Sequence, residues 1–128
     1  MEQKPLELIL ARNFLTNLST PAFLFAADGT VAFYNEAAGA LLGVPFEEFG
    51  RKPAAEWGRK VGPFDDGGEP IPIEELPITK ALRQGRPGHG RFVIRSVDGA
   101  EQEIEGSALP IVADTGQEGA MVFFWPAQ

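Results

Sequence analysis

The spacing of apolar residues predicts a helix near the start of the chain, over residues 5–18. Apolar residues recur there every three or four positions, which is the period of one helix face. This stripe consists of Leu8, Ala11, Leu15 and Leu18. Further apolar residues lie outside the stripe, although one buried face does not need them. We expect these extra residues either to pack across the chain's own sheet or to contact a second copy of the chain, as a homodimer interface; they are Leu6, Ile9, Leu10 and Phe14.

Two short apolar runs follow this helix and predict a β-hairpin. Residues 21–26 are rich in phenylalanine, and residues 30–34 can pair with them across Asp28-Gly29. An Asp-Gly pair between apolar runs is among the strongest short-range hairpin signals, because a two-residue turn of this kind needs positive φ at both positions. We therefore expect two antiparallel strands with both turn residues at positive φ.

Asn35 marks the change from strand to helix. Its side chain can accept a hydrogen bond from the first free N–H groups of a helix, and the acid that follows it is favoured at the positive end of the helix dipole. We expect a helix over residues 36–42 that ends at Gly43 in the left-handed conformation. Pro45 suits the first turn of another short helix, over residues 46–49.

The middle of the chain is irregular, and a helix follows it. Residues 50–73 contain four prolines and an Asp-Gly-Gly turn. Residues 74–84 read as a helix that Gly85 ends. This segment therefore contributes one helix and a long connection.

The last third of the chain predicts three strands, over residues 91–97, 102–109 and 119–125. Polar and apolar residues partly alternate in the first two, as in strands with one face in water. Residues 121–125 carry no polar side chain, so we expect them in the most enclosed strand. Two strands, several helices and then three strands form the α+β pattern of a sheet with its helices on one side.

Several segments, taken in this order, resemble those of bacterial PAS domains. They are residues 23–29, 34–38, 66–72, 74–77, 81–85, 96–99 and 108–111. The resemblance covers about residues 10–125. It implies a five-stranded antiparallel sheet with helices packed on one face, preceded by an N-terminal helix, so that residues 1–18 form this helix and residues 19–128 form the PAS domain.

The same resemblance implies a function. PAS domains are sensory and protein-interaction modules, so we expect a non-catalytic domain of bacterial signal transduction, with a signalling protein as a further partner. Many PAS domains continue from the last strand through an Asp-Ile-Thr type segment into a signalling helix. Here Pro126 follows Trp125. We expect either a domain that acts alone or a piece of a longer signalling protein.

Composition and charge exclude several other classes of function. The chain has 128 residues, of which 44% are hydrophobic and 23% charged, as in a single globular domain. It has neither an apolar run long enough to span a membrane nor a secretory signal pattern, so we expect a cytoplasmic protein. Its formal charge of −7 argues against nucleic acids and anionic membranes as partners.

The sequence excludes several kinds of cofactor but does not identify one. It contains no cysteine, which excludes disulfides, cysteine-ligated metals and the flavin-adduct cysteine of light-sensing PAS relatives. His89 is the single histidine, and its glycine neighbours predict a surface loop. A haem-binding PAS relative would carry its axial histidine in the helix at residues 74–84, which has none, so haem held in that way is not expected. The acidic residues between 65 and 75 lack the spacing of a calcium loop and read as a solvated turn.

One set of residues is expected between the helices and the sheet. In PAS relatives this space is either a filled core or a small-molecule pocket, and cores and pockets have the same composition. We expect a pocket small enough to be empty or to hold an adventitious ligand, with Asn35 acting mainly as a helix cap. The set comprises Phe33, Asn35, Leu41, Leu42, Phe49, Trp57, Ile78, Leu82, Phe92, Ile94, Ile104, Ser107, Leu109, Val122 and Phe124.

An enzyme on a small α+β cone, of the isomerase or hydrolase type, is the alternative. Such a site needs a buried carboxylate in an apolar cavity, often with a tyrosine as hydrogen-bond donor. Tyr34 is the single tyrosine, and the acids within an apolar strand are Glu103 and Glu105. Both acids alternate as residues of a solvated face do, so we assign no catalytic residue.

Overall fold

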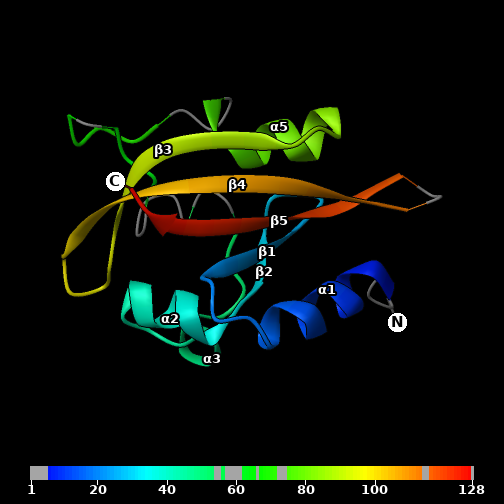
Figure 1. The fold of residues 1–128 in the computed structure, drawn as a ribbon, viewed down its shortest axis with the longest axis horizontal. Coiled ribbons are helices and arrows are strands. Elements are labelled where there is room, and N and C mark those ends of the chain that lie inside the picture. Colours follow the sequence, from blue (N-terminus) through cyan, green and yellow to red (C-terminus); the bar gives the residue numbers. More distant parts are fainter. Residues whose placement is uncertain are drawn as a thin grey trace.

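The computed structural model describes residues 6–53, 56, 62–65, 67–71, 75–113 and 116–127. Its elements follow the predicted order of two strands, several helices and three strands (Figure 1). They are α1 (Leu6–Thr16), β1 (Ala22–Ala26), β2 (Val31–Tyr34), α2 (Glu36–Leu42), α3 (Phe46–Phe49), α5 (Pro77–Gln84), β3 (Gly88–Arg95), β4 (Glu101–Ala113) and β5 (Gly116–Pro126).

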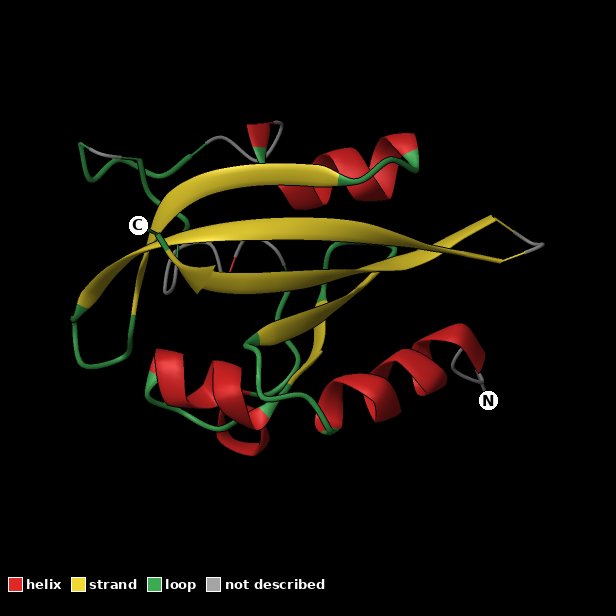
Figure 2. Ribbon diagram, viewed as in Figure 1, coloured by secondary structure: helices red, strands yellow, loops and turns green. Residues whose placement is uncertain are grey.

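The five strands form one antiparallel sheet in the order β2-β1-β5-β4-β3. The last strand of the chain, β5, therefore lies in the centre, between β1 and β4 (Figure 2). This confirms that the segment without polar side chains occupies the most enclosed position. The pairing of Phe23 with Val122 joins the first strand of the chain to the last.

Both faces of the sheet are covered by helices, and β1 shows how the side chains divide between them. Phe23 and Phe25 point into the core that α2, α3 and α5 close. The alternate residues Ala22 and Leu24 point to the opposite face. There the predicted stripe of α1 packs on the sheet, and its Leu15 is fully buried. Burial of one leucine side chain stabilises the fold by about 1.5–3 kcal/mol.

The first hairpin forms as predicted, but the predicted conformation of its turn is wrong. Gly29 has a φ of 88°, whereas Asp28 does not have a positive φ. Gly29 N–H donates to the Ala26 carbonyl oxygen, and Ala26 N–H donates to that of Thr30, each at 2.9 Å. The loop thus needs a left-handed conformation at glycine alone. The Asp28 carboxylate accepts a hydrogen bond from Thr30 N–H at 2.9 Å, which lowers the pKa of Asp28.

Several predicted boundaries need correction, including the start of β5, which begins at Gly116 and not at residue 119. The helix α5 begins at Pro77 and not at residue 74, because proline favours the first helical turn and holds Leu76 before it in an extended conformation. Residue 74 itself lies outside the described residues. The strand β3 begins at Gly88 because β4 supplies a pairing partner from there on. The strand β4 continues through Pro110 to Ala113.

Pro110 fits within β4 because of the sheet edge. Pairing between β3 and β4 starts at Gly88 and Ala108, so the residues beyond Ala108 have β5 as a neighbour on one side only. Figure 1 shows this β4–β5 hairpin extending past the end of β3. A proline lacks the N–H donor and is tolerated at such an edge.

Candidate functional site

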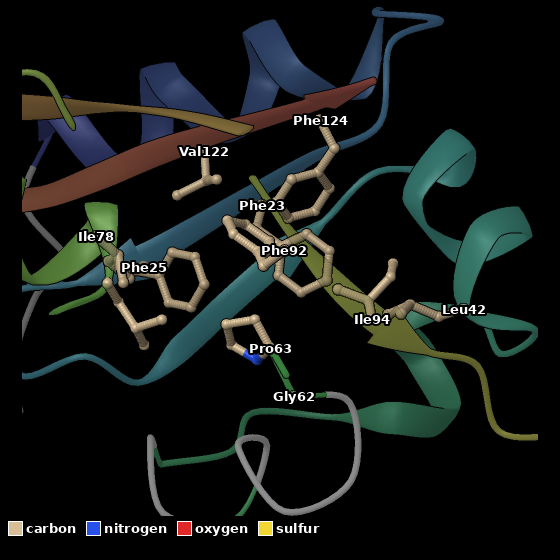
Figure 3. A pocket seen from close by; sticks show the side chains of 11 residues that line it. Phe23, Phe25, Leu42, Gly62, Pro63, Ile78, Phe92, Ile94, Val122 and Phe124 are labelled. Carbon is tan, nitrogen blue, oxygen red and sulfur yellow. The ribbon is translucent and has the colours of Figure 1, made fainter. Parts of the chain in front are cut away.

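The core between the sheet and helices α2 and α5 contains a cavity of about 50 Å³. Eleven of the described residues line it, and all of these present apolar groups (Figure 3). They are Phe23, Phe25, Leu42, Gly62, Pro63, Leu76, Ile78, Phe92, Ile94, Val122 and Phe124.

Strand alternation builds most of the cavity wall. Phe92 and Ile94 are two positions apart in β3, and Val122 and Phe124 are two positions apart in β5, so each pair faces the same side. The phenyl rings of Phe23 and Phe124 meet edge to face, with centroids 5.1 Å apart. Figure 3 shows these rings gathered beside Phe92. Packed aromatic rings thus form part of the wall, beside aliphatic side chains.

The size and lining of the cavity limit what it can hold. Ligand pockets usually measure about 300–1,000 Å³ and place a few polar groups against the ligand. This cavity is far smaller, and a water molecule inside it would find no polar side-chain partner among the described lining residues. Its chemistry therefore suits a packed core or a very small apolar molecule.

Six residues of the predicted set line the cavity. They are Leu42, Ile78, Phe92, Ile94, Val122 and Phe124. Four more pack in the same core without reaching the cavity, namely Leu41, Phe49, Leu82 and Ile104. The prediction missed Phe23, Phe25, Gly62, Pro63 and Leu76. The two phenylalanines could have been found, because they alternate in the first predicted strand.

Three predicted residues lie on the wrong face of the sheet for this cavity. Phe33 belongs to the core under α1, where the Arg12 guanidinium lies 4.5 Å from the centre of its ring. Ser107 and Leu109 alternate along β4 with Ala108, which faces the cavity side. Leu109 is 37% exposed. Trp57 lies outside the described residues.

Asn35 is the helix cap that the sequence predicts. Its Oδ1 accepts hydrogen bonds from Ala38 N–H at 3.0 Å and from Ala22 N–H at 3.1 Å. Its Nδ2 donates to the carbonyl oxygens of Leu15 at 3.1 Å and Thr20 at 2.8 Å. The side chain is buried and does not line the cavity. Asn35 therefore joins α1, β1 and α2, and the structure does not place it at the predicted pocket.

The groups considered for an enzyme do not converge on the cavity. The Tyr34 hydroxyl donates to the Val44 carbonyl oxygen at 2.5 Å. Burial raises the pKa of Tyr34, and the Glu47 and Glu48 carboxylates raise it further. The alternative reading needs a carboxylate beside such a tyrosine in an apolar cavity, and the described part of the cavity lining contains neither group.

The two acids considered with Tyr34 lie in β4 and hold other partners. Glu105 accepts a hydrogen bond from Trp125 Nε1 at 2.9 Å. Glu103 forms an ion pair with Arg91 at 3.0 Å, and both side chains are about half exposed. The groups that the alternative enzyme reading would need are therefore not brought together among the described residues.

His89 is exposed, as expected, but it lies in the strand β3 and not in a loop. Its ring packs against that of Trp125, with centroids 5.8 Å apart. Across the described ranges, no cluster of three or more histidine, cysteine, aspartate or glutamate side chains forms that could hold a metal ion. None of the described helices is long and apolar enough to cross a membrane.

Comparison with solved structures identifies the fold. The PAS domain of a protein from Colwellia psychrerythraea superimposes with a TM-score of 0.68 at 18% sequence identity, over 93% of this chain and 97% of that one. The chain has the PAS fold. The PAS domain of nitrogen regulation protein NR(II) from Vibrio parahaemolyticus matches with a TM-score of 0.65 at 14% identity, over 92% of this chain and 98% of that one.

A third PAS domain, from the fruit-fly ELK potassium channel, has a TM-score of 0.70 at 12% identity, over 93% of this chain and 95% of that one. No family model matches the sequence, and no curated protein matches it either. The PAS resemblance seen in the sequence is therefore confirmed at the level of the fold, by structures that share few of its residues.

Proposed function

We propose that this PAS domain is a non-catalytic sensory and protein-interaction module of bacterial signal transduction, active in the cytoplasm and working as a homodimer. The similar structures include PAS domains of a two-component sensor histidine kinase and of a nitrogen regulation protein. Those proteins are signalling proteins by name. The fold they share with this chain supports a signalling role.

The exposed apolar side of α1 is the observation that carries the proposal. Four apolar side chains of this helix are exposed, by 62% at Leu6, 43% at Ile9, 57% at Leu10 and 54% at Phe14. The opposite stripe of the helix already covers the sheet. A helix with apolar residues on both sides has a second surface to bury, and contiguous exposed apolar residues mark interaction sites.

A second copy of the chain is the partner that fits this surface. In a twofold contact the same patch meets itself, so apolar side chains would face apolar side chains. Two chains of charge −7 repel each other, which favours a contact through a patch rich in apolar residues. Burial of Leu10 and Phe14 would contribute about 1.5–3 kcal/mol for each side chain that becomes fully buried.

The cavity supports an interaction module more than a sensor of polar ligands. Its volume of about 50 Å³ and its apolar lining leave no place for a ligand that needs a hydrogen bond. Native mass spectrometry tests this part of the proposal. We expect a mass without a bound molecule, and a retained mass of a few hundred daltons that denaturation removes would contradict it.

The association itself is tested by light scattering on the wild type and two variants. We expect a mass of twice the 13.8 kDa chain for the wild type and a shift to monomer for Leu10→Glu. Val97→Glu is the matched control, because Val97 is 62% exposed and lies outside α1. Monomeric wild type at high protein concentration, in both low and high salt, would refute the dimer. Equal dissociation of the two variants would exclude the α1 surface as the contact.

A further inference from the structure

We propose that a groove between α5 and the start of β3 binds a small oxyanion, with a phosphate or carboxylate group. The groove has a volume of about 380 Å³ and is separate from the apolar cavity, although Leu76 lines both. Lys80 and Arg83 from α5 and His89 from β3 contribute to its lining. This site goes beyond the proposed dimer and does not depend on it.

The first argument is the segregation of charge. Five of the 11 lysines and arginines and none of the 18 acids lie within residues 76–97, in a chain whose formal charge is −7. Arg91 and Arg95 of this segment pair with Glu103 and Glu101 at 3.0 Å. The remaining cations of the segment therefore make it a positive region on an acidic protein.

The second argument is that Lys80 and Arg83 line the groove without an acidic partner among the described residues. They are three residues apart on α5, so their side chains are neighbours on the helix surface. In the part of the chain that the structure describes, neither forms an ion pair. Glu75 is the single acid among the described residues of the lining, so these residues together carry a net positive charge. Ammonium and guanidinium groups donate hydrogen bonds and accept none, which suits an anion.

The third argument comes from the edge of the sheet. Val93 exchanges two hydrogen bonds with Phe64, at 2.8 and 2.9 Å, so its N–H and C=O point away from β4. Outward-facing groups recur at every second residue of an antiparallel strand, and β3 pairs with β4 without a register shift. The N–H of His89 therefore points to the same open edge.

The His89 N–H adds a backbone donor to the two cations. Within the described ranges, β4 therefore offers this N–H no acceptor. Gly88 and His89 form the β3 side of the groove, opposite Lys80 and Arg83 of α5. Charged and backbone donors from two elements thus line one concave site.

The size of the groove favours a small molecule over an extended polyanion. A volume of about 380 Å³ falls within the range of small-molecule sites. A polyanion would need unpaired cations that continue along the surface, whereas Arg91 and Arg95 are already paired with acids of β4. We therefore expect one oxyanion group with a small body.

The test is an NMR titration of the full chain with sodium phosphate and, separately, with sodium citrate, each against sodium chloride of equal ionic strength. We expect saturable shifts at the amides of Lys80, Arg83 and His89. Shifts with phosphate alone, with citrate alone or with both support the site and identify the group it prefers. Absence of shifts with both would overturn it, as would tighter binding of an octaglutamate peptide than of either anion.

Variants that each remove one positive charge distinguish binding in the groove from nonspecific attraction of anions to the protein surface. Lys80→Gln and Arg83→Gln should each weaken anion binding about tenfold, because each removes a charged hydrogen-bond donor. Arg51→Gln is the matched control, since Arg51 is exposed and lies outside the groove. It should change the affinity less than twofold. Equal weakening by all three variants would contradict the proposal.

Discussion

The side-chain amide of Asn35 donates a hydrogen bond to the carbonyl oxygen of Leu15, 3.1 Å away and 20 residues earlier in the chain. Leu15 is fully buried near the end of α1, and Asn35 caps α2. The cap of one helix therefore also holds the end of another. Any movement of α1 relative to the sheet has to break this hydrogen bond or move Asn35 with the helix.

Replacement of Asn35 should destabilise the protein strongly. Asn35→Ala removes the buried hydrogen bonds of both the amide oxygen and the amide nitrogen. We expect a loss of about 2–4 kcal/mol in the free energy of unfolding. Asn35→Asp should lose at least as much, because a carboxylate oxygen would face the Leu15 and Thr20 carbonyl oxygens. Urea unfolding measures both, with Asn17→Ala as an exposed control. A loss below 1 kcal/mol for Asn35→Ala would show that this side chain does not hold the elements together.

Tyr34 should make stability depend on pH in the alkaline range. Burial raises the pKa of its phenol above the ordinary value of 10.0. Above pH 10 the unfolded chain loses this proton first, so the free energy of unfolding falls as pH rises. The contribution is fully present below pH 10 and is lost as pH rises through the pKa of the folded state.

Tyr34→Phe tests this prediction. We expect a loss of about 1 kcal/mol at neutral pH, because the Val44 carbonyl loses its donor. Above pH 10 the variant should lose less stability per pH unit than the wild type. The ultraviolet absorbance of tyrosinate follows the ionisation, since the chain has one tyrosine. Parallel stability curves for the two proteins would contradict the raised pKa.

Gly119 permits the close approach of β5 to β1. A Cβ at this position would collide with the Phe25 carbonyl oxygen and would lie 3.1 Å from Leu8 Cδ2 of α1. Gly119→Ala should therefore destabilise the protein by about 1–3 kcal/mol, as overpacking does. Gly67→Ala is the control, because its nearest neighbour would be an Asp65 oxygen at 3.4 Å. Thermal unfolding compares the two, and equal stabilities would show that β1 shifts without cost.

The sequence predicts the order of elements because local signals mark them. Asn35 before an acid predicts a helix start, and a glycine after a helical segment predicts a helix end, as at Gly43 and Gly85. The lack of polar residues in residues 121–125 indicates the centre of the sheet. These signals depend on a few neighbouring residues, so they can be read without the tertiary structure.

Most of the errors about the site concern contacts between segments that are distant in the sequence. His89 belongs to a strand because Ser107 lies opposite it, and no residue near His89 indicates this. Phe33 faces α1 because helices cover both faces of the sheet, so that apolar residues on either face are buried. Gly62 and Pro63 reach the cavity from an irregular segment without any periodicity. The positions of these residues depend on tertiary contacts, so local sequence patterns do not predict them.

The distance between the two α1 helices of a dimer tests the central claim most directly. The chain has no cysteine, so Asn13→Cys, at an exposed position on α1, carries a single spin label. Packed helices lie about 8–10 Å apart, so pulsed electron spin resonance should give one short, narrow distance between labels on two copies. A label at Val97→Cys should not give this distance. Absence of dipolar coupling between Asn13→Cys labels at high protein concentration would contradict association through α1.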